Sequence, residues 1–316
     1  MALDISLIEI FENITSRAAL ASYHFVGKKD KTAADKAAVD VMRNLLNNLD
    51  IQGKIVIGEG ELDEAPMLYI GEKVGTGQGL EIDIAVDPLE GTNFAANNLP
   101  GALSVLAVAE KNNLFHAPET YMNKIAVGSN IPRDAIDLDN SLKKNIYNLA
   151  DCKNKDITEL TACLLDRPRH KKIIEELNEL KVNLKLISDG DISGALLVSN
   201  EKYGVDIFMG IGGGPEGVLA ASALDAYNCN FQGRFIFEEE NDIYRAKKMG
   251  IKELDRKYEL SEIISGDSIF CATGITSGDL VKGIKLIDDK YSSETLVTHK
   301  NSNTKKVIKR TENLTS

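Results

Sequence analysis

Large apolar residues alternate with polar residues or alanine over residues 80–87 of this chain. A period of two predicts a β-strand with one face in a core. Pro88 follows and has no amide hydrogen to give to a neighbouring strand, so we expect the strand to stop there, with Asp87 at its carboxyl end. The apolar face would carry Leu80, Ile82, Ile84 and Val86, and the other face Glu81, Asp83, Ala85 and Asp87.

Apolar residues recur at helical spacing before this strand. The pattern predicts an amphipathic helix over residues 3–25 and a second helix, capped by Thr32, that continues through Leu49. Between that helix and the alternating strand, residues 54–57 carry three consecutive β-branched side chains and end at Gly58, which predicts a short strand.

Strand and helix patterns also alternate through the rest of the chain, which favours a mixed α/β fold. The stretch 161–187 reads as strand, helix, strand, and the polar tail from about Asp288 either pairs as an edge or frays. Predicted strands cover residues 103–109, 161–166, 182–187, 205–211 and 265–276, and predicted helices 141–149, 169–180 and 217–226. A further helix is expected to begin near Asp63 and Glu64 and to carry Met67, Leu68 and Ile70.

Composition narrows the class of protein. The chain has 316 residues, of which 43% are hydrophobic, enough for one large domain or two closely packed ones. A formal net charge of -11 argues against a nucleic-acid or anionic-membrane partner, so any phosphate site must be a local basic cluster. Four scattered cysteines without metal spacing indicate reduced thiols in a cytoplasmic protein. Neither a secretory signal nor a membrane-spanning run is evident.

The clearest candidate chemistry follows the alternating strand. Asp87 and Glu90 stand close together, and Gly91-Thr92 would place backbone amides beside them if a helix or nest begins there. Two hard acids next to an anion site suit a magnesium- or manganese-assisted phosphatase, because such ions bind oxygen ligands. The alternative is a solvated acidic turn at a strand end.

Other strand ends carry acids and one carries bases. Glu59 ends the strand at residues 54–57, and Asp189-Gly190-Asp191 ends another, where the acids would bind either a metal or sugar hydroxyls. Arg167, Arg169 and His170 form a basic cluster suited to a phosphate group, with a solvated helix start as the alternative. The glycines at 212–214 lack the G-K-[ST] of a P-loop.

These motifs together resemble one family. Asp87-Pro88-Leu89-Glu90-Gly91-Thr92 resembles the D-P-[ILV]-[DE]-G-[ST] signature of the lithium-sensitive, metal-dependent sugar phosphatases. The other motifs narrow the resemblance to the class II fructose-1,6-bisphosphatases of bacteria, over about Ser16 to Gly283. They are Gly58-Glu59-Gly60-Glu61, Asp63-Glu64-Ala65-Pro66-Met67, Leu165-Asp166-Arg167-Pro168-Arg169-His170, Ser188-Asp189-Gly190-Asp191 and Gly212-Gly213-Gly214-Pro215-Glu216-Gly217.

The resemblance implies a fold and an activity. The fold would be an α/β (α+β mixed) sandwich layered α/β/α/β/α, as in sugar phosphatases and inositol monophosphatases. Residues 1–160 would form a metal-binding half and residues 161–316 a sugar-binding half, packed as one globular unit. The activity would be hydrolysis of the 1-phosphate of fructose 1,6-bisphosphate to fructose 6-phosphate and phosphate, a gluconeogenic step, in a cytoplasmic homo-oligomer (dimer or tetramer).

The resemblance also implies residue roles. Two or more Mn²⁺ or Mg²⁺ ions would be held by Asp35, Glu59, Asp87, Glu90 and Glu216. Catalysis would involve Thr92, Asp63 and Glu59, where Asp63 helps to activate the attacking water and the mode of attack at Thr92, covalent or through water, stays open. Substrate would contact Lys31, Glu90, Gly91, Thr92, Tyr121, Arg167, Pro168, Arg169, Asp189, Gly190, Asp191 and Gly213.

One position departs from the family pattern. The class II sequence usually has glycine before the aspartate of D-K-x-x-A-D, and this chain has Lys29 before Asp30. Which of Lys28, Lys29 and Lys31 contacts the substrate therefore stays open.

Three other functions use similar residues. Sedoheptulose-1,7-bisphosphatase activity would need the same site. An inositol or nucleotide monophosphatase fits less well, because the arginines and the lysines at 28–31 imply a second phosphate. A non-enzymatic sensor of sugar phosphates or metals would have kept the site without turnover, and the intact Asp63 and Thr92 argue against it.

Overall fold

The computed structural model describes residues 3–60 and 67–314. The chain divides into two compact units, and each is built around its own β-sheet. The first unit combines Met1–His116 with Ile264–Ser316, and the second unit is Ala117–Ile263.

The first unit contains an eight-stranded mixed sheet in the order β12-β13-β11-β4-β3-β1-β2, with β14 paired to β13. Strands β1 and β3 run parallel, and the other neighbours are antiparallel. The strands are β1 (Ile51–Ile57), β2 (Lys73–Val74), β3 (Leu80–Glu90), β4 (Leu103–Glu110), β11 (Ser268–Gly274), β12 (Lys285–Ile287), β13 (Lys290–His299) and β14 (Thr304–Asn313).

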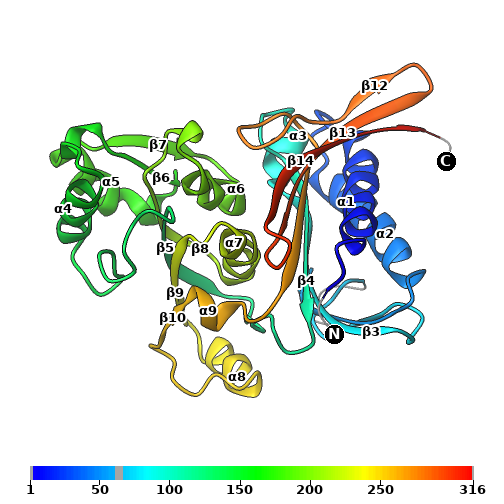
Figure 1. Ribbon diagram of the computed structural model, residues 1–316, viewed down its shortest axis with the longest axis horizontal. Helices are drawn as coiled ribbons and strands as arrows, with labels where there is room; N and C mark the ends of the chain where they lie inside the picture. Colours follow the sequence, from blue (N-terminus) through cyan, green and yellow to red (C-terminus); the bar gives the residue numbers. More distant parts are fainter. Residues whose placement is uncertain (1–2, 61–66, 315–316) are drawn as a thin grey trace. The chain divides into compact units, whose positions relative to one another are not determined.

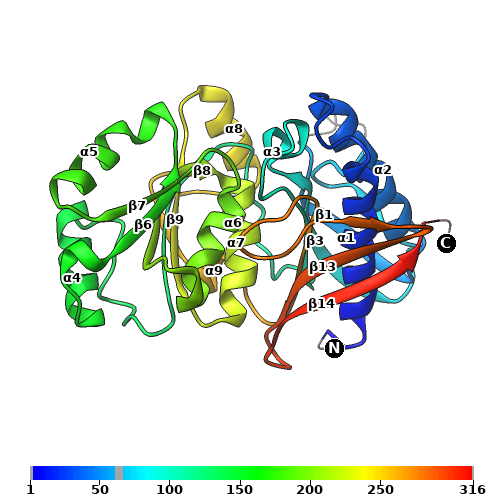
Figure 2. The same cartoon turned by 90° about the horizontal axis from the view of Figure 1, so that it is seen from above.

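Helices α1 (Leu7–Tyr23) and α2 (Lys31–Asn47) lie side by side and cover one face of this sheet (Figures 1 and 2). The apolar positions of β3 account for this packing, since Ile82, Ile84 and Val86 join Phe11 of α1 and Met42 of α2 in one buried cluster. The predicted strand and its apolar face are therefore confirmed, whereas Asp83 and Ala85 on the other face are also buried. The short helix α3 (Thr92–Ala96) follows β3.

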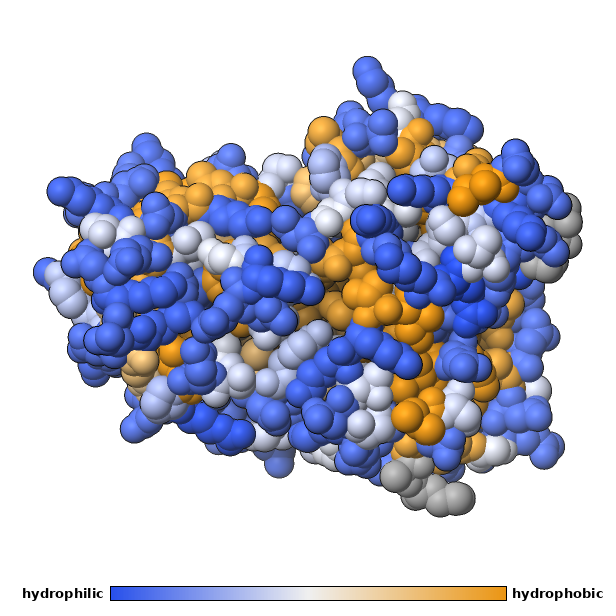
Figure 3. All heavy atoms as spheres, turned by 45° about the horizontal axis from the view of Figure 1, so that its top comes forward, coloured by the Kyte–Doolittle hydropathy of each residue, from blue (hydrophilic) through white to orange (hydrophobic). Residues whose placement is uncertain are grey.

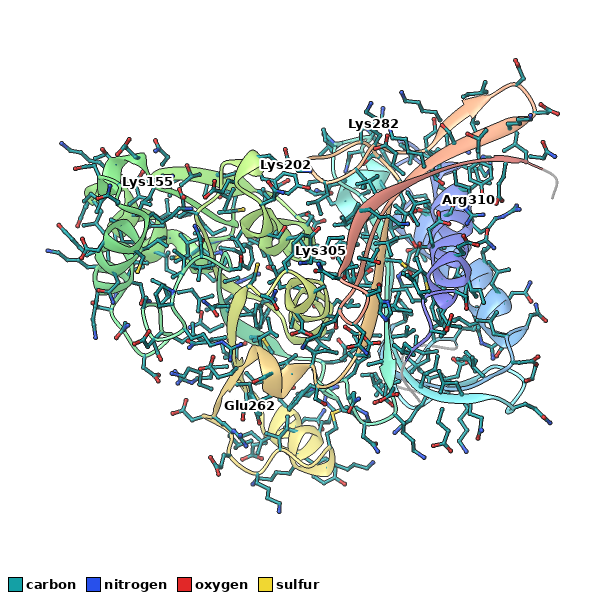
Figure 4. The ribbon with its side chains drawn as sticks, viewed as in Figure 1. Lys155, Lys202, Glu262, Lys282, Lys305 and Arg310 are labelled. Atoms are coloured by element: carbon teal, nitrogen blue, oxygen red, sulfur yellow. The ribbon has the colours of Figure 1, made fainter. Side chains whose placement is uncertain are left out.

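A buried polar network ties α1 to the last strands of the sheet. Glu12 is fully buried and accepts hydrogen bonds from Arg310 Nε at 2.6 Å and from Thr295 Oγ1 at 3.1 Å. Figure 4 labels Arg310 on β14, close to α1. A buried carboxylate needs such a partner, because an unpaired buried charge is strongly destabilising. The polar tail predicted from residue 288 thus pairs within the sheet as the β13–β14 hairpin.

Three local predictions in the first unit were wrong. The second helix is capped by Asp30, whose carboxylate accepts from Ala33 N at 2.9 Å, so it starts before Thr32. Strand β3 does not stop at Pro88, because a bulge between Asp87 and Glu90 absorbs the proline without breaking the strand. Met67, Leu68 and Ile70 lie outside any helix; Leu68 has a φ of 53°, which a right-handed helix excludes.

The second unit contains a six-stranded sheet in the order β10-β9-β5-β8-β6-β7. Its parallel pairs, β6–β7 and β6–β8, come from the predicted strand–helix–strand segment and its neighbour. The strands are β5 (Tyr121–Val127), β6 (Thr161–Leu165), β7 (Asn183–Ile187), β8 (Ile207–Gly213), β9 (Asn230–Ile236) and β10 (Lys257–Glu259).

Helices cover both faces of the second sheet, α4 and α5 on one side and α6 and α7 on the other (Figure 1). Every residue of α7 is buried except Glu216, which is half-buried, as expected for a helix with apolar residues on every side. The helices are α4 (Leu142–Lys153), α5 (Lys171–Glu179), α6 (Asp191–Leu196), α7 (Gly214–Ala226), α8 (Glu240–Lys248) and α9 (Leu260–Ile263), with 3-10 turns at Ile157–Glu159, Pro168–His170, Leu197–Ser199 and Glu201–Tyr203.

The mixed α/β class is confirmed, with a helix layer on a sheet in the first unit and a sheet between helix layers in the second. The boundary between the units differs from the predicted one at residue 160. Strand β5 pairs with β8 and β9 and so belongs to the second sheet, whereas β11 returns to pair with β4 of the first. Sheet pairing between distant segments, which local patterns do not report, sets the division.

Surface and covalent features agree with the composition. Hydrophilic side chains cover much of the face shown in Figure 3, with apolar patches among them. No disulfide links Cys152, Cys163, Cys229 and Cys271. Within residues 3–60 and 67–314, no helix has both the length and the apolar character needed to cross a membrane.

Candidate active site

In the first unit, two of the candidate acids lie directly before the corner between β3 and α3. The bulge carries Asp87 and Glu90, and Glu90 is 5% exposed. Gly91 then caps α3 with φ 78° and ψ 51°, in the left-handed region that glycine enters at little cost. Thr92 is the first helical residue, so the condition stated for the Gly91-Thr92 amides is met. The sharp corner therefore places the Thr92 hydroxyl and the first amides of α3 directly after two carboxylates.

Two further acids lie on elements beside this corner. Asp35 is on α2, which packs against both β3 and α3. Burial raises the pKa of the Asp35 carboxyl to about 6. Glu59 follows β1, the parallel neighbour of β3, and its amide donates to Leu68 O at 3.0 Å. Asp63 and Glu64 lie outside the described residues.

The loop before α2 is held against α3. The amides of Gly27 and Lys29 donate to Ala95 O and Ala96 O, both at 2.9 Å. Lys29 adopts a φ of 61°, a conformation that favours glycine over any residue with a Cβ. The glycine that the resemblance leads us to expect at this position would adopt this conformation without strain. Lys31, the predicted substrate contact, is the exposed first residue of α2.

In the second unit, the predicted basic cluster meets the predicted tyrosine. The guanidinium of Arg169 lies over the ring of Tyr121, 4.8 Å from its centroid, and its Nε donates to Ile211 O at 2.9 Å. Arg167 Nη2 lies 3.7 Å from Asp189 Oδ1. Pro168 separates the two arginines in the chain and opens the 3-10 turn that contains Arg169.

His170, the third member of that cluster, does not belong to a phosphate site. It is fully buried, its Nδ1 lies 2.6 Å from Leu165 O, and its Nε2 accepts from Ile211 N at 2.7 Å. These partners assign the neutral form with the proton on Nδ1, and burial lowers the pKa of the imidazole. His170 therefore links β6 to β8 and supports the neighbouring Arg169.

A second corner follows β7. Gly190 caps α6 with φ 83° and ψ 60°, so Asp191 is the first helical residue. Asp191 is 8% exposed, and its carboxylate forms an ion pair with Lys124 of β5. Lys124 Nζ also donates to Gly213 O at 2.6 Å.

The glycine-rich turn after β8 is shaped by two acids. A side chain at Gly212 would collide with the carboxylate of Asp191, and one at Gly213 with that of Glu216. Burial raises the pKa of Glu216, and the nearby Lys124 ammonium opposes this rise. Tyr121, Gly213 and Glu216 also line a pocket of about 410 Å³ with Glu119, Thr120, Pro215, Glu238, Glu239 and Asp242.

Comparisons with known proteins decide the family. The family described as "Bacterial fructose-1,6-bisphosphatase, glpX-encoded" matches residues 6–312. The chain belongs to this family. The class II bisphosphatase motifs identified in the sequence are thus motifs of the chain's own family, and the chain is a phosphatase of the hydrolase class.

Relatives of this bisphosphatase family cover nearly the whole chain. A protein of Thermosynechococcus vestitus (strain NIES-2133 / IAM M-273 / BP-1) is 40% identical over 95% of this chain and 94% of its own length. A protein of Prochlorococcus marinus (strain MIT 9515) is 41% identical over 92% of each. Both are named D-fructose 1,6-bisphosphatase class 2/sedoheptulose 1,7-bisphosphatase.

Solved structures are more distant. The extragenic suppressor from Pyrococcus furiosus is 14% identical, with a TM-score of 0.32 over 60% of this chain and 69% of that one. The inositol monophosphatase from Anabaena (Nostoc) sp. PCC 7120 is 9% identical, with a TM-score of 0.33 over 61% and 71%.

The acids expected to bind metal in this bisphosphatase are all carboxylates, which matches the preference of Mg²⁺ and Mn²⁺ for oxygen ligands. Glu90 and Asp35 are desolvated, so a cation would offset the cost of their burial. Among the residues that the structure describes, no three Asp, Glu, His or Cys side chains converge to hold a metal ion. The donor chemistry therefore fits a metal site, and the ligand set stays a prediction.

Sequence reasoning missed Lys124. A signal was present, because a lysine stands among Met122, Ile125, Ala126 and Val127 in a buried strand, where charged residues are rare unless paired. Its partners, from α6 and the end of β8, were not readable from local patterns.

Proposed function

We propose that this chain hydrolyses the 1-phosphate of fructose 1,6-bisphosphate to fructose 6-phosphate and phosphate, and the corresponding phosphate of sedoheptulose 1,7-bisphosphate. One observation carries the preference for a bisphosphate: the pair of Arg169 and Tyr121, beside Arg167, on an otherwise acidic chain. The names of the 40% identical relatives support both substrates.

The distal phosphate would bind at the arginines. Arg169 uses Nε to hold Ile211 O, and within the described part of the chain its two terminal nitrogens make no hydrogen bond or ion pair. Those two nitrogens form the edge that grips a phosphate in bidentate fashion. Tyr121 holds the guanidinium plane from one side, so the edge is fixed in direction before the ligand arrives.

The scissile phosphate would bind at the β3–α3 corner. Gly91 and Thr92 supply backbone amides and a hydroxyl there. Asp35, Glu59, Asp87, Glu90 and Glu216 would hold Mn²⁺ or Mg²⁺, two or more ions in all. When bound, such ions neutralise the phosphoryl oxygens and activate water. Asp63 would accept a proton from the attacking water.

Sugar hydroxyls would be recognised mainly by Asp189. Its side chain is 26% exposed, whereas Asp191 is buried and already paired with Lys124. The Gly190 corner and the Gly213 carbonyl complete this surface, and Asp191 acts by fixing it.

Phosphate release tests the proposal. The purified protein should release phosphate from fructose 1,6-bisphosphate and sedoheptulose 1,7-bisphosphate with Mn²⁺ or Mg²⁺, and chelation should stop it. Inositol 1-phosphate is the monophosphate control, and faster turnover of that substrate would replace the proposal with a monophosphatase. Tight binding of the bisphosphates by a metal-loaded protein without phosphate release would favour the sensor.

The distal-phosphate site has its own test. Arg169→Ala should raise KM for fructose 1,6-bisphosphate about 10-fold or more, because a charge-assisted contact contributes on the order of 1.5–3 kcal/mol. Lys202→Ala, at an exposed position of the same unit (labelled in Figure 4), is the control and should leave KM unchanged. An unchanged KM in Arg169→Ala would remove this residue from the site.

The cytoplasmic location and the dimeric or tetrameric state are proposed from the family resemblance. Size-exclusion chromatography with light scattering would test the oligomer, and a monomer at micromolar concentration would contradict it.

A further inference from the structure

Lys124 is the most deeply buried lysine among the residues that the structure describes. Its side chain is 1% exposed on β5, in the middle of a sheet. Burying an ammonium group is costly unless it is paired and hydrogen-bonded, so such a lysine needs a reason. The proposed function gives it no role in binding substrate or metal.

The ammonium group joins three elements. It pairs with Asp191 at the start of α6 and donates to the carbonyl of Gly213 at the end of β8, 2.6 Å away. The Gly213 carbonyl lies one peptide before α7, whose first turn carries Glu216. One buried charge therefore fixes the start of α6 and the entry to α7 together.

The backbone of the β8–α7 turn packs closely against the side chain of Lys124 and its neighbours. A Cβ at Gly217 would lie 3.3 Å from Lys124 Cδ and 2.7 Å from Met122 Sδ, so the lysine stem fills the space beside α7. Side chains at Gly212 and Gly213 would collide with Asp191 and Glu216. The three glycines thus bring the β8–α7 turn close to the lysine and the two acids.

We propose that Lys124 is a positioning residue, whose ammonium holds Asp191 and the Gly213 carbonyl so that α7 presents Glu216 to a metal ion in a fixed orientation. The inference rests on the proposed function, because it takes Glu216 as a metal ligand. Residues that orient metal ligands change metal affinity or activity by roughly 10- to 100-fold when they are replaced. A buried pair that only stabilises the fold would change neither.

The second unit offers a matched control. Lys153 pairs with Asp206 at 2.6 Å, with side chains 11% and 7% exposed, and lies on α4. Lys124→Met and Lys153→Met each remove one ammonium group from beside a buried aspartate, and Asp206 keeps a second ion pair, with Lys155 at 3.1 Å. Both should lower Tm, and only Lys124→Met should change the site.

The experiment measures Mn²⁺ binding by calorimetry without substrate, then kcat and KM for fructose 1,6-bisphosphate, and Tm. We expect Lys124→Met to weaken Mn²⁺ binding and lower kcat at least about 10-fold each, whereas Lys153→Met stays within about twofold of the wild type. A folded Lys124→Met protein that binds Mn²⁺ and turns over as the wild type does would overturn the proposal.

A double variant keeps the test valid if Lys124→Met alone does not fold. Lys124→Met with Asp191→Asn removes both charges of the pair, so no carboxylate is left unpaired at that position. The Gly213 carbonyl still lacks its donor, and we expect the weakened Mn²⁺ binding to persist. Restoration of wild-type Mn²⁺ binding would show that Lys124 only neutralises Asp191, which contradicts positioning.

Failure of this inference differs from failure of the proposed function. If the wild type binds Mn²⁺ but hydrolyses neither bisphosphate, the proposed substrates are wrong, and the Mn²⁺ binding of Lys124→Met still tests positioning. If the wild type binds no Mn²⁺, positioning of a metal ligand is overturned.

Discussion

The turns at Gly91 and Gly190 have the same backbone conformation and differ in the side chains that they position. Gly91 after β3 and Gly190 after β7 have nearly the same dihedral angles, and each starts a helix with a polar residue. At the first corner that residue is Thr92, which follows a bulge with two acids. At the second it is Asp191, buried against Lys124. A single turn geometry thus leads to a partly exposed hydroxyl in one unit and to a buried charge in the other.

This comparison predicts that side chains at the first corner act in the reaction. Asp87→Ala and Thr92→Ala should each lower kcat by at least about 100-fold, as removal of a preorganised electrostatic contact does. Circular dichroism and Tm should show that each protein stays folded. Retained turnover in either variant would remove that residue from the catalytic set.

Substituting the glycines tests the shared backbone. Gly91→Ala and Gly190→Ala should each destabilise the fold by about 1–2 kcal/mol, because a Cβ is strained in the left-handed region. Gly91→Ala should be the more damaging, since its Cβ would also lie 2.8 Å from the ring of Phe94. Urea unfolding measures both, and equal stability to the wild type would contradict the assigned conformation.

We expect low pH to destabilise the second unit through protonation of His170. Its pKa is lowered by burial, so the unfolded chain binds this proton more readily than the folded one. Stability should therefore fall as pH decreases through about 6.5, by at most about 1.4 kcal/mol per pH unit. Urea unfolding at several pH values compares the wild type with His170→Gln, in which this part of the slope should vanish. An unchanged slope would refute the assignment.

The smallest effect is expected at Lys29. Lys29→Gly should stabilise the first unit by about 0.5–1 kcal/mol, because it removes a strained left-handed lysine from the loop against α3. Tm measures the change. Lys28→Gly is the control, and a gain there of the same size would point to charge instead of backbone strain.

Local patterns predicted the elements well where one periodicity dominated. The strand predicted over residues 80–87 and the strand–helix–strand of 161–187 are both present. Errors arose where a single residue was given too much weight. Pro88 sits in a bulge instead of ending a strand, and Asp30 caps the helix ahead of Thr32 because its carboxylate reaches the amide of Ala33.

The candidate site also contains features that the sequence predicted and features that it did not. Arg169 and Tyr121 meet as the motifs implied, and His170 does not join them, because a backbone carbonyl and a backbone amide occupy its two nitrogens. Lys124 was missed because its importance depends on contacts with Asp191 and Gly213, which come 67 and 89 positions later in the chain. Spacing within a motif cannot report such contacts.

The return of β11, β13 and β14 to the first sheet has a consequence for biosynthesis. A ribosome completes all of Ala117–Ile263 before it synthesises β11, which pairs with β4. Strand β14, which carries the Arg310 that binds Glu12, is synthesised later still. Glu12 is therefore synthesised early, and nearly 300 further residues must be added before its partner Arg310 is present. The continuous second unit can finish folding during translation, whereas the first must hold an incomplete sheet until its last strands arrive.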